Sequence, residues 1–405
     1  MKTVVMKFGG SSVADVQKVQ NVARRVVEKK KAKNHVVVVV SAPGDMTDDL
    51  IEKAHQLCES PSEREMDMLL STGEQVSIAL LRMAIHHLKA GAVSLTGPQA
   101  GIYADHNHTR AKITKILPDK IQEELRKGNV VIVAGFQGIN PNQDIATLGR
   151  GGSDLTAVAL AAALKADACE IYTDVSGVYT TDPRIVPEAR KLDKISYDEM
   201  LEMAGAGSQV MQARSIEVAK KYGVELQVRS TFLKEEGTWI IEEVKGMEDV
   251  IVSSIAFDKN QSKLTVLGVE DRPGIAARIF GELAEAHINV DMIIQSAAQD
   301  RTNDISFTIA RTDLKKALSI LKEVGKELKS QGISCEEKVA KVSIVGVGMK
   351  SHAGVAAKMF KTLSDEKINI EMISTSEIKV ACVVKEFECQ QAVKALHKAF
   401  ELHKK

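Results

Sequence analysis

The sequence predicts an α/β protein with a mostly parallel central sheet, followed by two small βαββαβ units. Three observations support this prediction: apolar runs alternate with helical patterns up to about residue 245, shorter elements begin at about 262, and the later part repeats itself. Runs that are apolar on both faces and separated by helices are typical of parallel strands covered by helices on each side. The expected strands are 4–6, 36–40, 130–134, 170–173 and 225–228.

The composition excludes several classes of function. Lys plus Arg and Asp plus Glu each total 54 in the 405 residues, so no basic field favours nucleic acid or a membrane surface as partner. The five cysteines are odd in number and lack Cys-x-x-Cys spacing, which argues against a disulfide framework and a zinc site. The chain has no N-terminal apolar signal segment and no run of about 20 apolar residues. We therefore expect a cytoplasmic protein of two or three domains.

Ligands of such sheets bind beyond the carboxyl ends of the strands, and the first candidate segment lies there. Lys7-Phe8-Gly9-Gly10-Ser11-Ser12 follows the first expected strand and places a cation beside two glycines. Because glycines leave room for converging backbone amides, this layout predicts a phosphate cradle, with an ordinary tight turn as the alternative. The other segments at strand ends are 41–47, 135–138 and 173–184.

A second glycine-rich segment precedes an alanine-rich helix expected over 155–165. Gly151, Gly152 and Ser153 would present backbone amides at the helix N-terminus, which is a ready anion site. Arg150 adds a guanidinium that can grip a carboxylate or phosphate in a bidentate manner. Asp154 lies in the first helical turn, where a carboxylate is also favoured simply by the helix dipole.

The third segment, 173–184, combines hydroxyl groups with Tyr179 and Arg184 after an apolar strand, which suits a nucleotide better than a hairpin. The chain has neither a Walker A motif nor the protein-kinase motifs. His106 and His108 form a His-x-His pair, but no acid or cysteine accompanies them at ligand spacing. We therefore expect solvated loop histidines and no metal site.

The later part of the chain is a tandem duplication. Residues 274–280 recur as 354–360 and residues 288–293 recur as 368–373, both with an offset of 80. Each copy reads as strand, glycine turn, amphipathic helix and two strands followed by a second helix, and in the first copy the amphipathic helix is expected over 275–285. Such a repeat serves either as a structural or dimerisation element or as a ligand-binding unit.

In this order, the segments 7–12, 71–74, 150–154 and 173–184 ahead of two repeats closely resemble the aspartate kinase family over essentially the whole chain. The resemblance implies an amino acid kinase fold over 1–245 and ACT domains over 262–340 and 341–405, with 250–258 as a candidate strand to complete the second. It implies ATP-dependent phosphorylation of the L-aspartate side chain to 4-phospho-L-aspartate, the first step of lysine, threonine and methionine biosynthesis. The alternatives are a kinase of acetylglutamate or glutamate, and a catalytically silent amino-acid sensor.

The resemblance also implies roles for individual residues, with ATP and Mg²⁺ as cofactors. Lys7 and Asp154 would be catalytic. The nucleotide would contact Lys7, Phe8, Gly9, Gly10, Ser41, Thr173, Asp174, Tyr179 and Arg184. Aspartate would contact Thr47, Glu74, Arg150, Gly151, Gly152 and Ser153, with Glu74 on its α-ammonium and Arg150 on its α-carboxylate; a surface helix position is the alternative for Glu74. Gln209 stands where many relatives carry a lysine, which puts one nucleotide contact in doubt.

The repeats imply feedback inhibition by lysine, threonine or both. The expected regulatory positions are Asp271, Gly274, Ile275, Asn289, Asp291, Gln295, Asn369 and Glu371. In the family, ACT pairs from two subunits join, so we expect a homo-oligomer or a partnership with a separate regulatory subunit, for which Met247 would be an internal start. The sequence leaves the effector, the subunit number and that internal start open.

Overall fold

The computed structural model describes residues 1–208, 210–242, 251–297, 302–352 and 354–404, so Gln209 and Met247 lie outside the described residues. The chain divides into two compact units. The first unit comprises Met1–Val178, Lys191–Ala204 and Gln209–Lys245, and the second comprises Tyr179–Arg190, Gly205–Ser208 and Gly246–Lys405.

The first unit is built on an eight-stranded sheet in the order β10-β12-β11-β9-β1-β2-β6-β3. All neighbouring strands are parallel except β11 and β12, which confirms the prediction of a mostly parallel sheet. The strands are β1 (Thr3–Phe8), β2 (His35–Val40), β3 (Ala92–Leu95), β6 (Val130–Ala134), β9 (Ala168–Thr173), β10 (Lys194–Ser196), β11 (Leu226–Ser230) and β12 (Thr238–Ile241). Strand β1 continues through Lys7 and Phe8, two residues beyond the apolar run that predicted it.

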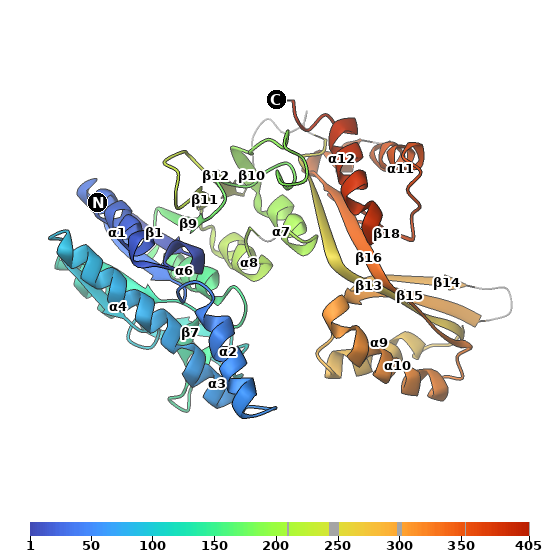
Figure 1. Ribbon diagram of the computed structural model, residues 1–405, viewed down its shortest axis with the longest axis horizontal. Coiled ribbons are helices and arrows are strands. Elements are labelled where there is room, and N and C mark those ends of the chain that lie inside the picture. Colours follow the sequence, from blue (N-terminus) through green and yellow to red (C-terminus); the bar gives the residue numbers. More distant parts are fainter. Residues whose placement is uncertain (209, 243–250, 298–301, 353, 405) are drawn as a thin grey trace. The chain divides into compact units, whose positions relative to one another are not determined.

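Helices cover both faces of this sheet (Figure 1). Helices α1 (Val16–Lys31) and α4 (Thr72–His87) pack side by side on one face, where Met6, Val38 and Ile132 join Val22 and Leu81 in a fully buried core. Helix α6 (Gly152–Leu164) packs on β1, β2 and β9 from the other face. Burial on both faces explains why the strand sequences are continuously apolar.

The remaining elements of the first unit surround this core. Four short strands form a second sheet in the order β5-β4-β7-β8. These strands are β4 (Ile102–Ala104), β5 (Ile113–Ile116), β7 (Gln137–Ile139) and β8 (Ile145–Thr147). The other helices are η1 (Gly10–Ser12), α2 (Met46–Leu57), α3 (Glu63–Leu70), α5 (Asp119–Arg126), α7 (Tyr197–Gly205) and α8 (Ala213–Tyr222).

Within the part that the structure describes, one helical run, Glu63–His87, is long and apolar enough to cross a membrane by length and composition. In its most apolar window, 44% of the residues are buried in the first unit. The run consists of α3 and α4, and it contains the buried carboxylates of Asp67 and Glu74. Buried core helices pass the same test, so this run is weak evidence for a membrane span.

The second unit contains one six-stranded antiparallel sheet in the order β14-β15-β13-β16-β18-β17. Its strands are β13 (Ser254–Glu270), β14 (Val290–Ala297), β15 (Thr302–Ala310), β16 (Gly332–Val345), β17 (Met372–Thr375) and β18 (Lys379–Lys385). Its helices are α9 (Ile275–Glu285), η3 (Arg311–Asp313), α10 (Leu314–Glu327), η4 (Val347–Ser351), α11 (Val355–Asp365), η5 (Glu386–Glu388) and α12 (Cys389–Ala399).

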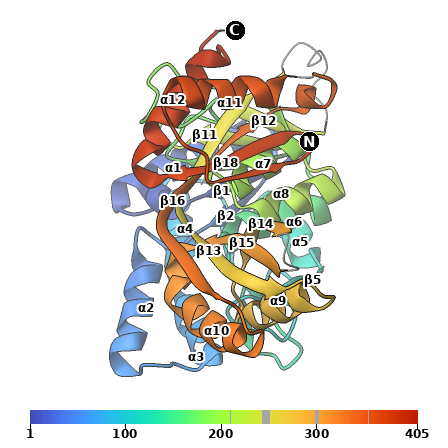
Figure 2. The same cartoon turned by 90° about the vertical axis from the view of Figure 1, so that its right-hand side faces the viewer.

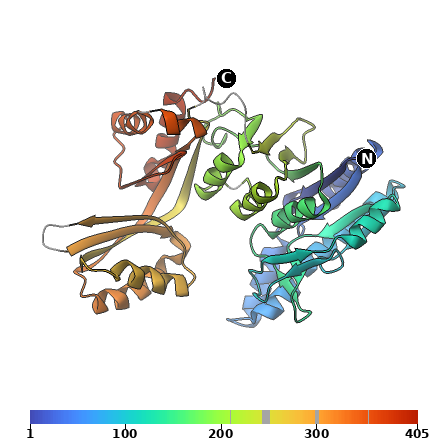
Figure 3. The same cartoon turned by 180° about the vertical axis from the view of Figure 1, so that it is seen from behind.

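Two long strands, β13 and β16, are shared by both copies of the repeat and run side by side through the unit (Figure 2). Residues 254–258 of β13 pair with 341–345 of β16 beside α11 and α12, whereas residues 263–267 pair with 332–336 beside α9 and α10. Helices α9 and α10, seen from behind in Figure 3, pack against each other on the sheet. Gly274 and Gly354 precede α9 and α11 with the same φ of 98°, so the duplication extends to backbone conformation.

Candidate active site

Four parallel strands end at the same edge of the large sheet. Phe8 of β1 is in register with Val40 of β2 and with Tyr172 of β9, and Val40 is in register with Ala134 of β6. The segments that follow these strands therefore lie at one edge. The sequence predicted this position for 7–12, 41–47 and 135–138, and for the beginning of 173–184.

Lys7 and Asp154 form an ion pair at this edge. Nζ of Lys7 lies 2.6 Å from Oδ1 of Asp154, and only 12% and 11% of the two side chains are exposed. Lys7 comes from β1, whereas Asp154 lies in the first turn of α6. The ammonium is therefore held at a fixed point beside the helix N-terminus, in surroundings where its charge is weakly screened.

The glycines after β1 allow two loops to touch. A Cβ atom on Gly10 would lie 2.8 Å from the carbonyl oxygen of Ala42, so no larger residue fits there. The amide of Gly44 donates to the carbonyl of Gly10 at 3.1 Å. The amide of Gly9 donates to the carbonyl of Tyr172 at 3.3 Å, so it is already engaged, contrary to the expectation that it faces a phosphate. Gly10 opens the 3₁₀ turn, where an amide has no preceding carbonyl in the helix.

The segment before α6 has a similar arrangement. Gly151 adopts a left-handed conformation with φ of 74°, and a Cβ atom there would overlap the side chain of Gln212. The amide of Gly152 donates to the carbonyl of Gly149 at 2.9 Å, so it is not a free anion donor as the sequence suggested. Ser153 packs against Gly135 after β6, which joins this segment to the sheet edge. Arg150 is exposed, and among the described residues its guanidinium makes no ion pair or hydrogen bond.

Glu74 is a buried carboxylate with one unpaired oxygen. Its side chain lies at the start of α4, and the residue is 3% exposed. Oε1 accepts a hydrogen bond of 3.1 Å from the amide of Ala42, whereas Oε2 is buried and has no partner among the described residues. Burial raises the pKa of Glu74 from 4.5 to about 7. The structure therefore excludes the alternative of a solvated surface carboxylate.

The remaining candidate nucleotide residues belong to different units. Ser41 directly follows β2 and Thr173 ends β9, whereas Thr47, a predicted aspartate contact, lies at the start of α2. The hydroxyl of Thr173 donates to Asp174 at 2.9 Å. Tyr179 and Arg184 fall in the second unit, where Arg184 pairs with Asp182 at 2.8 Å and remains 88% exposed.

Several of the expected regulatory positions already have partners in the second unit. Asp271 accepts from Asn303 at 2.8 Å. Asp291 on β14 pairs with Lys341, whose side chain is 2% exposed. Glu371 occupies the position in the second repeat that Asp291 occupies in the first, and its Oε2 lies 3.1 Å from Nζ of Lys263. The positive charges of Lys263 and Lys385 lower the pKa of Glu371.

The other regulatory positions lie at element ends or on exposed strands. Gly274 caps α9, whose first residue Ile275 is buried, while Asn289, Gln295 and Asn369 are exposed. No group of three or more metal-ligating side chains was found among the described residues. All five cysteines are free thiols.

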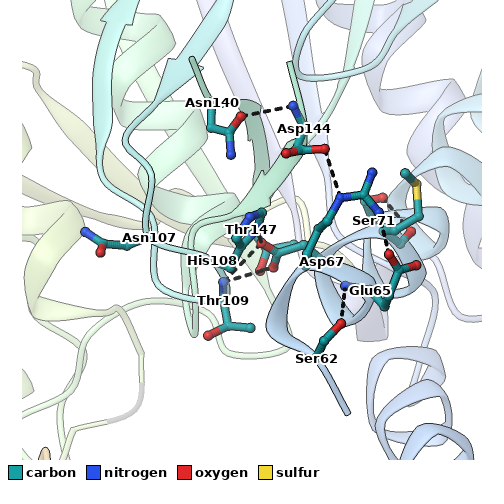
Figure 4. Close-up of polar contacts among 12 residues, drawn as sticks. Ser62, Glu65, Asp67, Ser71, Asn107, His108, Thr109, Asn140, Asp144 and Thr147 are labelled. Carbon is teal, nitrogen blue, oxygen red and sulfur yellow. Dashed lines mark hydrogen bonds and ion pairs between the residues drawn. The ribbon is translucent and has the colours of Figure 1, made fainter. Parts of the chain in front are cut away.

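The sequence did not reveal a buried network around Asp67 (Figure 4). Asp67 is fully buried on α3 and accepts from Nδ1 of His108 at 2.6 Å, so His108 is not a solvated loop residue. The same carboxylate accepts from the hydroxyl of Thr147 at 2.5 Å. The only available signal was an acid between two apolar residues, Met66 and Met68, in a helical segment.

A parallel sheet whose carboxyl edge carries a largely buried Lys–Asp pair, two glycine turns and a buried acid is the arrangement that the sequence predicted for a phosphotransferase of the amino acid kinase class. A model of the amino acid kinase family matches residues 2–230, and two models of the ACT domain match residues 263–328 and 342–400. The aspartate kinase of Pseudomonas putida is 51% identical over 403 residues, which cover 99% of this chain and 98% of that protein. The chain therefore belongs to the aspartate kinase family, and the predicted fold and function are confirmed.

Two solved structures extend this comparison. E. coli aspartokinase III in complex with aspartate and ADP, in the R-state, matches with a TM-score of 0.83 and 27% identity, over 98% of this chain and 99% of that one. The same enzyme in complex with lysine and aspartate, in the T-state, matches with a TM-score of 0.78 and 27% identity, over 99% and 100% of the two chains.

Proposed function

We propose that this chain transfers the γ-phosphoryl group of ATP to the side-chain carboxylate of L-aspartate, giving 4-phospho-L-aspartate and ADP. The acceptor carboxylate is already ionised at neutral pH, so the reaction needs no general base. The enzyme must instead align two anions and stabilise the charge that spreads over the transferring group. The buried ion pair between Lys7 and Asp154, at 2.6 Å, is the observation that carries this proposal.

Lys7 stabilises the transferring phosphoryl group, and Asp154 fixes the position of its ammonium. With Gly10 at the turn after β1, this cation forms the phosphate end of the site. Phe8, Gly9, Ser41, Thr173 and Asp174 line the same sheet edge and would contact the nucleotide. Tyr179 and Arg184, which fall in the second unit, remain predicted nucleotide contacts.

The end of the site proposed to bind the amino acid has one fixed carboxylate, Glu74, and, among the described residues, one unpaired guanidinium, Arg150. Oε2 of Glu74 is buried without a partner, and an α-ammonium would supply the missing donor. Arg150 has no ionic partner of its own among the described residues, which leaves it available for the α-carboxylate. Thr47, Gly151, Gly152 and Ser153 surround this end of the site in our assignment.

The residues present fit a Mg²⁺ ion that arrives on the nucleotide. Mg²⁺ usually binds through one or two carboxylates, phosphate oxygens and waters, and Asp174 and Asp154 are two carboxylates at this edge. The ion would neutralise negative charge on the phosphates. Asp174 and Asp154 would hold it there.

The test is ADP release, measured with a coupled assay in the presence of MgATP and one amino acid at a time. We expect release with L-aspartate and trapping of the acyl phosphate by hydroxylamine. Release with glutamate or N-acetylglutamate instead would favour another amino acid kinase, and no release with any of them would favour a silent sensor.

We further assign catalysis to 1–245 and regulation to the ACT domains 262–340 and 341–405, in a cytoplasmic homo-oligomer joined through those domains. The match to a lysine complex in the T-state supports lysine, alone or with threonine, as an inhibitor. Activity should fall when millimolar lysine and threonine are added singly or together. Full activity under every combination would refute feedback control, and light scattering at the assay concentration would test the oligomer.

A further inference from the structure

Asp67 contacts the two segments that carry Glu74 and Arg150, the residues proposed to bind the charged ends of the amino-acid substrate. Its backbone carbonyl accepts from the amide of Ser71 at 3.1 Å, and Ser71 is the residue before α4, where Glu74 lies in the first turn. Its carboxylate accepts from the hydroxyl of Thr147, three residues before Arg150. One residue therefore contacts both the helix start that bears the buried acid and the segment that bears the guanidinium.

The carboxylate of Asp67 is fully engaged by protein donors. Oδ1 accepts from the amide of Thr109 at 3.0 Å and from the hydroxyl of Thr147, while Oδ2 accepts from Nδ1 of His108 at 2.6 Å (Figure 4). The side chain is fully buried, so each of these contacts acts without competition from water. No sequence neighbour supplies them, because the donors come from positions 41, 42 and 80 residues away.

The segment that follows Thr147 is fixed at successive residues. The carbonyl of Thr147 accepts from the amide of Ala111 at 2.9 Å, and the amide of Leu148 donates to the carbonyl of Phe136 at 2.8 Å. The guanidinium of Arg214 donates to the carbonyls of Leu148 and Ala111, at 2.9 and 2.8 Å. Among the described residues no hydrogen bond or ion pair holds the guanidinium of Arg150, so its position depends on the backbone that precedes it.

We propose that Asp67, through the hydroxyl of Thr147, is a positioning residue that sets the placement of Arg150 relative to Glu74 and thereby the affinity for the amino-acid substrate. The inference rests on the proposed role of Arg150. It assigns no contact between Asp67 and any substrate. A displacement of about 1 Å of a charged substrate-binding group can lower the rate by a large factor. A buried hydrogen bond that fixes Arg150 relative to Glu74 should therefore affect aspartate binding directly.

The test compares Thr147→Val, which removes the hydroxyl at nearly constant shape, with Thr147→Ser, which retains it. We expect Thr147→Val to raise the KM for aspartate about tenfold while the KM for ATP changes less than twofold, and Thr147→Ser to stay within twofold of the parent. His108→Gln, a change on the less buried side of the same carboxylate, provides a second variant if Thr147→Val does not fold. We expect it to raise the aspartate KM by a smaller factor. Equal increases in both KM values would overturn the proposal.

A double-mutant cycle with Arg150→Ala separates this inference from the proposed function. If Thr147 acts through Arg150, Thr147→Val should change kcat/KM for aspartate less than twofold in the Arg150→Ala background. An undiminished effect there would overturn the positioning role while leaving Arg150 as a substrate residue. If Arg150→Ala alone leaves kcat/KM for aspartate unchanged, the substrate role of Arg150 is wrong and the inference fails with it.

Discussion

The buried carboxylate of Glu74 predicts a pH dependence of aspartate binding. Its pKa is raised from 4.5 to about 7 because the side chain is removed from water. A shift of this size corresponds to about 3 kcal/mol of cost for ionising the group in the ligand-free site. The α-ammonium of aspartate supplies the opposite charge that the site lacks, so the substrate should bind to the ionised form and favour it.

The expected change in KM follows from this pKa. The fraction of ionised Glu74 falls from about nine-tenths at pH 8 to about one-tenth at pH 6, so the KM for aspartate should rise about tenfold between these values. The side-chain carboxylate of aspartate stays ionised throughout this range. The KM for ATP, whose phosphates lie at the other end of the proposed site, should change much less.

The assay is the coupled ADP-release rate against aspartate at saturating MgATP, measured between pH 6 and pH 8 for the parent and for Glu74→Gln. The variant should show a KM raised about 30-fold or more at pH 8 and no residual slope with pH, because the titrating group is gone. It should also raise the melting temperature of the ligand-free protein at pH 8, since the cost of a buried charge is removed. A KM that stays constant with pH in the parent, or a slope that persists in Glu74→Gln, would refute the reasoning.

Lys7→Ala should lower kcat by about 10² to 10³ without loss of the fold, because it removes the fixed charge beside the transferring group; activity near that of the parent in a folded variant would contradict this role. Gly73→Ala should destabilise the protein by about 1–3 kcal/mol in urea unfolding, since its Cβ would lie 2.6 Å from that of Ala42. The matched control Gly281→Ala, in an open position within α9, should stabilise by about 0.5–1 kcal/mol, and the same sign for both variants would be inconsistent with the packing. Burial lowers the pKa of His397 below 6.5, so the folded state binds fewer protons than the unfolded state. The stability of the protein should therefore fall as the pH drops below 6.5. In thermal melts, His397→Asn should reduce the dependence of the melting temperature on pH in this range.

The local pattern of the chain determined most of the secondary structure. The helix expected at 275–285 is α9 with the same limits, and the run expected at 130–134 is β6. Both follow from signals that a short segment contains, namely a glycine before an amphipathic repeat and a continuous apolar run. The offset of 80 residues likewise predicted the duplication, which the equal φ values of Gly274 and Gly354 reproduce in the backbone.

The motifs predicted which segments meet at the sheet edge but not which of their groups are free. The amides of Gly9 and Gly152 looked available in the sequence, yet each donates to a carbonyl of the protein. His108 looked solvated because its acidic partner, Asp67, lies 41 residues away. Hydrogen-bond partners of this kind depend on how distant segments meet, and no local spacing encodes them.

The sequence by itself determined the order of the motifs, the mostly parallel sheet and the tandem repeat, because each depends on residue types within one segment. The tertiary structure decided the burial of Glu74, the pairing of Lys7 with Asp154 and the assignment of Tyr179–Arg190 to the second unit. Burial and ion pairing are properties of side chains from several segments at once, and a raised pKa arises only when those segments together exclude water.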